Sequence, residues 1–436
     1  MKAIKLFIVF IRHLYHLIRF KTLSDEQIRR EQFKKLKNLI DFAWNHIPFY
    51  QELWGKAGFN PSLFKSIDDI SLIPCIDKNM VRENYEKMVP DNYHKSKLTL
   101  VTTGGTTGVP MNFYINKLDA QTKEFAFQLW RNYCMWGYKQ CLDKVVILRG
   151  NRISPQLIGK HIFWQKGRLE NALICSSFHL TEQNYNSYLN KIRAFKPRFI
   201  KAYPSSIALL CSLMKKHGDA KIETLQGIIC SSENVYDWQR KLVKEVLDVE
   251  ILSFYGHSEK AVWAFQNSQQ KLLFHPLYSY TEFLNKNFQT IEAVGEIAQV
   301  VVTSFDNKYF PFIRYLTSDY VEVGESILHY PKVANRIIGR EQEFVYDKNS
   351  NKVIFTCSDE LLWGIDGVIA YQYRQQEVGK LILCLQVNEQ FTIPSIEKIL
   401  GIGKSIFVDF DLLVEIVDYI PKTSNGKFRY LIQNIK

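Results

Sequence analysis

A run of small and hydroxyl-bearing residues, TTGGTTGVP, occupies Thr102 to Pro110. Glycine lets main-chain N–H groups approach a ligand closely, and the neighbouring threonine hydroxyls add side-chain donors. Together these groups suit the binding of phosphate oxygens. The run lacks the Gly-Lys-Ser/Thr ending of a Walker loop and the helix that follows it. The alternative interpretation is a polar surface hairpin.

A second stretch, Tyr255-Gly256-His257-Ser258-Glu259, follows a strand-like segment over Ile251 to Phe254. The aromatic ring could stack on a base. The carboxylate could hold Mg²⁺ together with substrate phosphates, which is how this ion is usually bound. The alternative is an ordinary junction between a strand, a turn and a helix.

Two further stretches carry charge next to a turn. In Arg314-Tyr315-Leu316-Thr317-Ser318-Asp319, the aspartate could accept both hydroxyls of a ribose, and the alternative is an Arg–Asp pair that braces the turn. In the segment Pro421 to Arg429, Asn425-Gly426 favours a tight turn that would present Lys427 as a point charge. The alternative there is a solvated hairpin tip.

The elements that would position these residues alternate between helix and strand, which indicates an α/β core. Ser24 to Gln27 has the pattern of a capping box, followed by a helix that Pro48 ends. Two more helices are predicted over Gln121–Met135 and Trp238–Leu247. Buried strands are predicted over Lys144–Leu148, Phe199–Ala202 and Gly227–Cys230, and strands flank the Gly/Thr run over Leu98–Thr102 and Met111–Ile115.

From Gly295 onward strands dominate, and a second unit begins near Gly339. The first strands are expected over Gly295–Ser304, Tyr309–Tyr315 and Tyr320–Val323, and those of the second unit over Glu343–Tyr346, Val353–Thr356, Val368–Tyr373, Leu381–Val387 and Leu412–Val417, with a helix over Ser395–Leu400. We therefore predict a large, multi-subdomain α/β domain over 1–338 and a small α+β domain over 339–436.

The N-terminus, MKAIKLFIVFIRHLYHLIRF, is basic and apolar. Its uncharged runs are far shorter than the ~20 residues that span a bilayer, and it lacks the cleavage site of a signal peptide. It is predicted to form a helix over 1–22, either packed on the body of the protein or lying on an anionic membrane surface.

Charge and cysteine content narrow the function classes. The formal net charge is +12, and residues 1–60 hold 11 Lys/Arg against 5 Asp/Glu. A polyanionic ligand or membrane fits this balance, whereas no nucleic-acid-binding signature is present. The 8 cysteines form no CxxC pair and indicate free thiols in a reducing, cytoplasmic compartment.

In this order, the four stretches resemble the adenylate-forming (ANL) superfamily, closest to its phenylacetate–CoA ligase-like and capsular-polysaccharide-biosynthesis branch. The resemblance covers nearly the whole chain, including His46-Ile47-Pro48-Phe49-Tyr50 near the front. It implies that a carboxylic acid and ATP give an acyl-adenylate and pyrophosphate, with a mobile C-terminal domain. Its most specific part is the Gly/Thr run with the C-terminal Gly-Lys turn.

The resemblance also implies roles for individual residues. Thr103, Thr106, Thr107 and Gly108 would hold the β- and γ-phosphates, and Ser231, Ser232, Glu233 and Asn234 match the adenine-binding segment. Tyr255 would stack on the base, Ser258 would touch the α-phosphate, Glu259 would bind Mg²⁺ and Asp319 would bind ribose. Arg340 would lie near ribose or phosphate, and Lys427 matches the catalytic lysine of adenylation.

The sequence departs from the family pattern at two positions of the phosphate loop. Gly104 stands where the family often has serine, and Met111 stands where it often has lysine. Weaker ATP binding is the expected consequence. Some relatives carry a Cys/His zinc site after the Tyr-Gly turn, but residues 260–276 contain His275 and no cysteine, so no zinc is expected.

Three functions fit these residues. The first is a ligase that passes the acyl group to an amine or hydroxyl, such as a sugar in surface or capsular polysaccharide biosynthesis, with peripheral contact at the inner face of the membrane. The second is an acyl- or aryl-CoA ligase that uses coenzyme A as acceptor. The third is a non-catalytic nucleotide-binding protein. Phe178, His179, Tyr203 and Tyr255 are candidates for the acid pocket, and the alternative is that these aromatic residues belong to the core.

Overall fold

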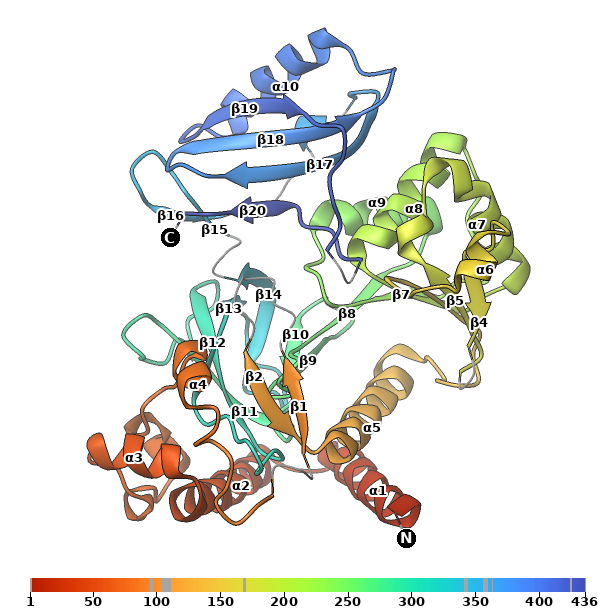
Figure 1. The fold of residues 1–436 in the computed structure, drawn as a ribbon. Coiled ribbons are helices and arrows are strands. Elements are labelled where there is room, and N and C mark those ends of the chain that lie inside the picture. Colours follow the sequence, from red (N-terminus) through yellow and green to blue (C-terminus); the bar gives the residue numbers. More distant parts are fainter. Residues whose placement is uncertain are drawn as a thin grey trace. The chain divides into compact units, whose positions relative to one another are not determined.

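The computed structural model describes residues 2–94, 98–102, 111–167, 170–340, 344–355, 360–362, 364–423 and 426–435, with backbone alone at 2–6, 340, 354 and 360. The chain divides into two compact units, shown within Figure 1. Unit 1 consists of Met1–Lys139 and Phe254–Ile338, and unit 2 consists of Gln140–Ser253 and Gly339–Lys436. Both this division and the predicted one separate residue 338 from residue 339. In the structure, however, residues 339–436 group with residues 140–253, which the prediction had placed in the large domain.

Helices of unit 1 come from its first segment. They are α1 (Lys2–Phe20), α2 (Asp25–His46), α3 (Pro48–Lys56), α4 (Lys78–Asn84) and α5 (Lys117–Trp136), with 3-10 turns η1 (Pro61–Leu63) and η2 (Ile67–Leu72). The predicted capping box is confirmed, since Ser24 and Gln27 exchange side-chain-to-backbone hydrogen bonds at the start of α2. The predicted end of this helix is also confirmed: α2 ends at His46, and Ile47 has the extended backbone that a following proline favours. Pro48 then opens α3, where its missing N–H costs nothing.

The strands of unit 1 form a hairpin and a larger sheet. The hairpin pairs β1 (Thr99–Thr102) with β2 (Asn112–Ile115) antiparallel, so the prediction that the Gly/Thr run joins two strands is confirmed. The sheet has the order β11-β12-β13-β14-β10-β9. Its strands are β9 (Trp263–Gln266), β10 (Leu272–Phe274), β11 (Ser279–Leu284), β12 (Ile297–Ser304), β13 (Tyr315–Val323) and β14 (Val333–Arg340).

The strand predicted over Tyr309–Tyr315 is wrong except for its last residue, because β13 begins at Tyr315. The preceding segment is irregular but buried, with Phe310, Phe312 and Ile313 in the core, which explains its strand-like pattern. Its polar backbone groups are satisfied outside a ladder: the Tyr50 hydroxyl donates to the Pro311 carbonyl at 2.7 Å, and the Ile313 N–H donates to that hydroxyl at 3.2 Å.

Unit 2 contains a parallel sheet covered by helices. Its strand order is β8-β7-β6-β3-β5-β4, and all neighbours except β4 and β5 run parallel. The strands are β3 (Val145–Arg149), β4 (Trp164–Lys166), β5 (Ala172–Ser176), β6 (Phe199–Ala202), β7 (Gly227–Cys230) and β8 (Ile251–Gly256), the last of which continues into unit 1. The helices are α6 (Pro155–Ile158), α7 (Glu182–Phe195), α8 (Pro204–His217) and α9 (Asp237–Leu247), with η4 (Ser177–His179).

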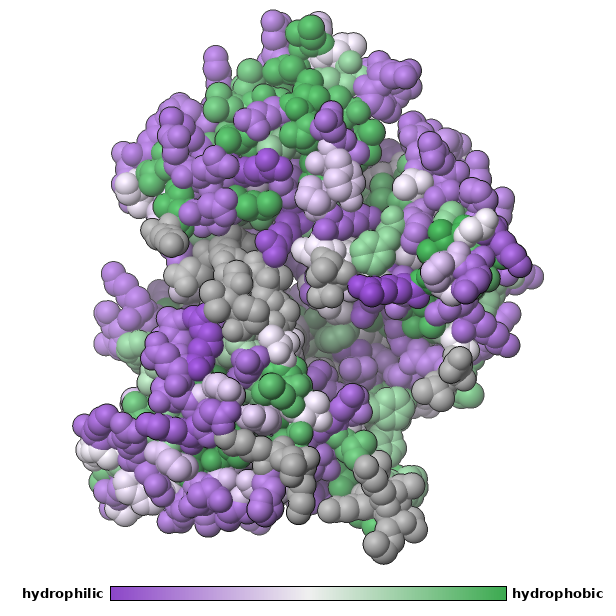
Figure 2. Space-filling model, in the orientation of Figure 1, coloured by the Kyte–Doolittle hydropathy of each residue, from purple (hydrophilic) through white to green (hydrophobic). Residues whose placement is uncertain are grey.

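The C-terminal part of unit 2 has its own sheet and core. The sheet order is β19-β18-β17-β20, with α10 beside β19 (Figure 1). Its elements are β15 (Phe344–Tyr346), β16 (Lys352–Ile354), η6 (Glu360–Leu362), β17 (Val368–Gln375), β18 (Lys380–Val387), α10 (Ile393–Ile406), β19 (Asp411–Ile416) and β20 (Leu431–Gln433). Figure 2 shows hydrophobic surface over this part. Its exposed hydrophobic side chains include those of Ile393, Val408 and Leu413. The mixed α/β fold predicted for the chain is confirmed.

Helix α1 packs on the body of unit 1, which is the first of the two alternatives considered for the N-terminus. Leu17 and Phe20 are buried, and the helix lies against α5 (Figure 1). The opposite face is exposed. Among the described helices, none is long and apolar enough to cross a membrane.

Candidate functional site

A row of polar side chains lies at the carboxyl ends of four neighbouring parallel strands in unit 2. Arg149 ends β3 opposite Ser176, which ends β5. Tyr203 and Ser231 each come one residue after the paired strand ends Ala202 and Cys230. Ligands of open α/β sheets bind at this edge of the sheet. We call these four residues the carboxyl-edge row.

The segment that resembles the adenine-binding motif begins in this row. The buried Ser231 Oγ accepts a hydrogen bond from Arg149 Nη2 at 2.9 Å. Ser232 is exposed and has a left-handed backbone, with φ 76°, which a non-glycine residue seldom adopts. A strained residue of this kind at a strand end is a common feature of functional turns.

Glu233 anchors the C-terminal turn to this segment. Its carboxylate accepts from the Ser205 N–H at 3.0 Å and the Ser205 hydroxyl at 3.1 Å, and also from the Phe428 N–H at 3.1 Å. Burial raises the pKa of the Glu233 carboxyl, and these hydrogen bonds act in the opposite direction. The residue following Lys427 is therefore hydrogen-bonded to the predicted adenine-binding segment.

The turn that carries Lys427 is closed by its own backbone. The Thr423 N–H donates to the Lys427 carbonyl at 2.8 Å, and the Lys427 N–H donates to Thr423 Oγ1 at 3.1 Å. Gly426 has φ +76°, and a Cβ there would lie 2.8 Å from the Gly150 Cα. Glycine therefore permits both the backbone conformation and the close approach to the carboxyl end of β3. Lys427 itself is half-buried.

In unit 1, three predicted or neighbouring side chains form one cluster. The Tyr255 hydroxyl donates to Asp319 Oδ2 at 2.7 Å, and His257 Nε2 lies 2.7 Å from the same oxygen. Asp319 is buried. The alternative of an Arg314–Asp319 brace is not what forms, because Arg314 pairs with Glu282 at 2.9 Å. Sequence reasoning missed His257 as a partner of Asp319, although it lies inside the Tyr255–Glu259 motif.

Glu259, the predicted magnesium ligand, is buried in unit 1. Its Oε1 lies 3.3 Å from the Tyr315 hydroxyl, and that hydroxyl lies 3.9 Å from Met111 Sδ. Ser258 next to it is exposed. Within the described ranges, no group of three or more His, Cys, Asp or Glu residues could hold a metal ion. A carboxylate with substrate phosphate oxygens is a sufficient donor set for Mg²⁺, so the residue fits the predicted role.

Several predicted residues lie outside the described part of the chain. They are Thr103, Thr106, Thr107 and Gly108, and also the side chain of Arg340, whose backbone ends β14. The loop's neighbours are described: Thr102 faces Asn112 across the hairpin, and its Oγ1 donates to Asn112 Oδ1 at 2.8 Å.

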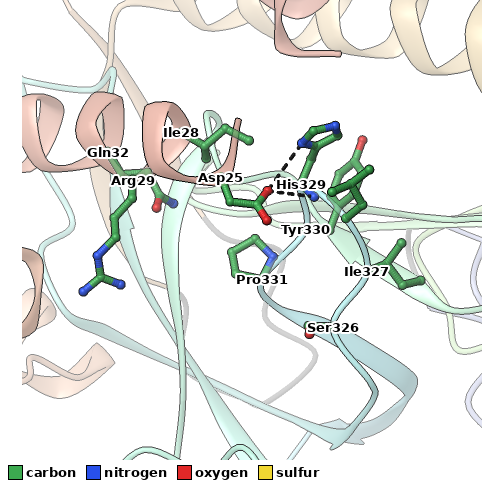
Figure 3. Close-up of a pocket in the computed structure, with 10 residues that line it drawn as sticks. Asp25, Ile28, Arg29, Gln32, Ser326, Ile327, His329, Tyr330 and Pro331 are labelled. Atoms are coloured by element: carbon green, nitrogen blue, oxygen red, sulfur yellow. Dashed lines mark hydrogen bonds and ion pairs between the residues drawn. The ribbon is translucent and has the colours of Figure 1, made fainter. Parts of the chain in front are cut away.

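A pocket of ≈ 540 Å³ lies elsewhere in unit 1 (Figure 3). It is lined by the start of α2 and by the connection between β13 and β14. Asp25 Oδ1 accepts from the His329 N–H at 3.2 Å and lies 3.4 Å from His329 Nδ1. None of the predicted site residues lines it, so we assign it no part in the site.

Comparisons with known proteins show which proteins the chain is similar to. The family model of the CapK C-terminal domain matches residues 345–434. Protein CapK of Staphylococcus aureus is 24% identical over 98% of this chain and 94% of its own length. Phenylacetate-coenzyme A ligase of Escherichia coli (strain K12) is 23% identical over 78% of each chain.

A solved structure, 2-hydroxyisobutyryl-CoA ligase in the postadenylation state, shares the fold with a TM-score of 0.73 at 17% identity, covering 95% of this chain and 91% of that chain. Nearly full-length similarity in both sequence and fold thus coincides with the matching C-terminal family model. These similarities support assignment of the chain to the adenylate-forming superfamily, in the branch that contains CapK and the phenylacetate-coenzyme A ligases.

Proposed function

We propose that this protein activates a carboxylic acid with ATP, giving an acyl-adenylate and pyrophosphate, and then transfers the acyl group to an acceptor. The observation that carries the proposal is the anchoring of the Lys427 turn to Glu233 at the carboxyl edge of the sheet in unit 2. This brings the candidate catalytic lysine to the segment that resembles the adenine-binding motif.

The chemistry follows from charge. An oxygen of the acid attacks the α-phosphorus, the new P–O bond forms, and pyrophosphate leaves with the bonding electrons. Both reactants are anions, so a preorganised cation at the attacked phosphate stabilises the transition state. Lys427 is the residue assigned to this role. Mg²⁺, held by Glu259 with the phosphates, would neutralise phosphate charge.

The remaining predicted residues bind the nucleotide in this proposal. Tyr255 stacks on the adenine and Asp319 accepts the ribose hydroxyls, while Ser231 to Glu233 border the base. Thr103, Thr106, Thr107 and Gly108 cradle the β- and γ-phosphates, Ser258 contacts the α-phosphate, and Arg340 lies near ribose or phosphate. Residues 1–338 form the adenylation domain, and residues 339–436 form the domain that rotates between the half-reactions.

ATP–pyrophosphate exchange with a panel of acids tests the proposal. The panel contains amino acids, short hydroxy acids and aromatic acids. At least one acid is expected to support exchange by the wild-type protein. Exchange with none of them would instead support a non-catalytic nucleotide-binding protein.

Replacement of Asp319 by alanine is expected to raise the KM for ATP by about 10- to 100-fold, since hydrogen bonds to a charged group contribute roughly 1.5–3 kcal/mol. The expected change in the KM for the acid is small. The matched control is Glu322→Gln on the same strand, a carboxylate that pairs with Arg336. Equal KM values for ATP in wild type and Asp319→Ala would remove Asp319 from the nucleotide site.

The proposed function has two versions, which differ in the molecule that accepts the acyl group. We favour an amine or hydroxyl, such as a sugar in capsular or surface polysaccharide biosynthesis, because similarity to CapK extends over 98% of this chain. Coenzyme A is the alternative, given the similarity to phenylacetate-coenzyme A ligase. Product analysis with coenzyme A present distinguishes them: an acyl-CoA product supports the second version.

We further propose a cytoplasmic protein that contacts the inner face of the membrane through α1. Ile8, Ile11, Tyr15 and Ile18 lie at helical spacing and expose 61%, 44%, 60% and 61% of their surface. Exposed Arg12 and Arg19 flank this stripe, and no acidic residue precedes Asp25. An apolar stripe with a basic border suits an anionic lipid surface.

Cosedimentation with phosphatidylserine-containing vesicles is expected for the wild type, with weaker binding to neutral vesicles and at high salt. Ile11→Asp combined with Tyr15→Asp should abolish binding, because two charges would enter the apolar layer. The control Ile393→Asp changes an isoleucine that is 79% exposed in the C-terminal part. Unchanged vesicle binding by the double variant would contradict the proposal, as would dimerisation through the same face without vesicle binding.

A further inference from the structure

Arg149 carries a positive charge that no described carboxylate neutralises. Its Nη2 donates to the neutral Ser231 Oγ, and its guanidinium lies 5.7 Å from the centre of the Tyr203 ring. Its Nε is shielded from solvent and has no hydrogen-bond partner among the described residues. A shielded cation without a counter-charge is unfavourable, and burial accordingly lowers the pKa of the Arg149 guanidinium.

Other groups around the same strand ends are also donors. Lys422 Nζ donates to the Ser177 carbonyl at 2.8 Å, and no described carboxylate pairs with it. The buried Ser177 Oγ and Asn151 Nδ2 have no hydrogen-bond partner in the described part of unit 2. Ser177 follows Ser176, the residue opposite Arg149, and Asn151 comes two residues after Arg149. Cations and unused donors therefore gather where β3 and β5 end.

The nearest acidic group does not balance this charge. Glu233 interacts electrostatically with both Arg149 and Lys422. Its carboxylate, however, already accepts from Ser205 and from the Phe428 N–H, and burial raises its pKa. The Glu233 carboxylate is therefore the one described acidic group that interacts with both Arg149 and Lys422, and its oxygens already accept hydrogen bonds from other donors.

We infer that the carboxyl-edge row, together with Ser177, Asn151 and Lys422, binds an oxyanion group of a reactant, a carboxylate or a phosphate, and that Arg149 is its principal ligand. A guanidinium presents planar, parallel N–H donors that match two oxygens of either group. The inference deepens the proposed function by adding an anion-binding residue other than Lys427. It rests on that function only for the identity of the reactants.

Direct binding to the full-length protein tests the inference without turnover. Inorganic pyrophosphate probes the phosphate source and malonate probes the carboxylate source, each by isothermal titration. We expect wild type to bind at least one probe, and Arg149→Gln to weaken that binding by about 10- to 100-fold. The probe affected identifies the source. Arg152→Gln, an exposed arginine three residues further on, is expected to bind like wild type.

Arg149→Lys keeps the positive charge but loses the planar pair of N–H donors, so it is expected to weaken binding less than Arg149→Gln does. This variant also serves if Arg149→Gln does not fold, as judged by circular dichroism. No binding of either probe by wild type, or equal binding by wild type and the folded Arg149 variants, would overturn the inference. The binding measurement requires no activation of an acid. A negative binding result therefore contradicts this inference alone, whereas a negative exchange assay contradicts the proposed function.

Discussion

Lys427→Ala is expected to slow adenylation by about 10²–10³-fold, by analogy with the loss of one preorganised electrostatic donor. A supplied acyl-adenylate should still be converted at nearly the wild-type rate, because in the proposed function the C-terminal domain carries the lysine out of the site before the second half-reaction. ATP–pyrophosphate exchange measures the first half-reaction, and consumption of synthetic acyl-adenylate in the presence of acceptor measures the second.

The structure makes this variant informative. The turn is closed by the backbone N–H and carbonyl of Lys427 with Thr423, and the anchor to Glu233 uses the Phe428 N–H. Alanine at position 427 keeps all of these hydrogen bonds, so any loss of adenylation rate is attributable to the missing ammonium group. The control is Lys404→Ala, which removes an exposed lysine from α10. Equal losses in both half-reactions would contradict a lysine that serves adenylation alone.

Arg314→Met is expected to lower the free energy of unfolding by about 3–5 kcal/mol, because it leaves the charge of Glu282 buried without its partner. Arg314 Nη2 donates to Glu282 Oε1 at 2.9 Å, and its Nη1 donates to the carbonyls of Ser71 at 3.1 Å and Ile73 at 2.7 Å. Both charged side chains are less than a tenth exposed. One arginine thus ties β11 to the end of η2 and to the residue that follows it.

Denaturant unfolding followed by tryptophan fluorescence measures the effect. The matched control is Arg336→Met, which breaks the Arg336–Glu322 pair, whose arginine is 55% exposed, and should cost at most about 1 kcal/mol. The double variant Arg314→Met with Glu282→Leu should recover part of the loss, because no buried charge then remains. Equal effects of Arg314→Met and the surface variant would show that the buried pair has no special weight.

Local patterns predicted much of the fold. Short apolar runs located β3, β6 and β7, and the Ser24–Gln27 capping box located the start of α2, because these signals depend on nearby residues. The same kind of local pattern wrongly predicted a strand in the buried segment before β13. Its aromatic residues alternate as in a strand, but its backbone bonds go to the Tyr50 side chain and to β12, which no local pattern reveals.

The candidate site was predictable where a motif holds its residues together in sequence. Tyr255 and Glu259 were proposed from one motif, Asp319 from a second and Lys427 from a third, and their roles stay predictions. Pairs of side chains that meet only because of the register between strands could not be predicted from sequence motifs. Arg149 meets Ser231 across 82 positions, and Glu282 meets Arg314 across 32, so their pairing appears only when the strands are aligned. His257 lay inside a motif, but its bond to Asp319 also depends on the fold.

In the proposed function an oxygen of the acid itself attacks the α-phosphorus of ATP, and transfer of an oxygen isotope to AMP reports this step. The acid that best supports exchange is labelled with ¹⁸O in its carboxylate and incubated with protein, ATP and acceptor, and the nucleotide products are examined by mass spectrometry. Acyl transfer breaks the bond between the acyl carbon and the bridging oxygen, so the expected product is AMP that carries one ¹⁸O atom. Unlabelled AMP, or ADP with the label in inorganic phosphate, would contradict it.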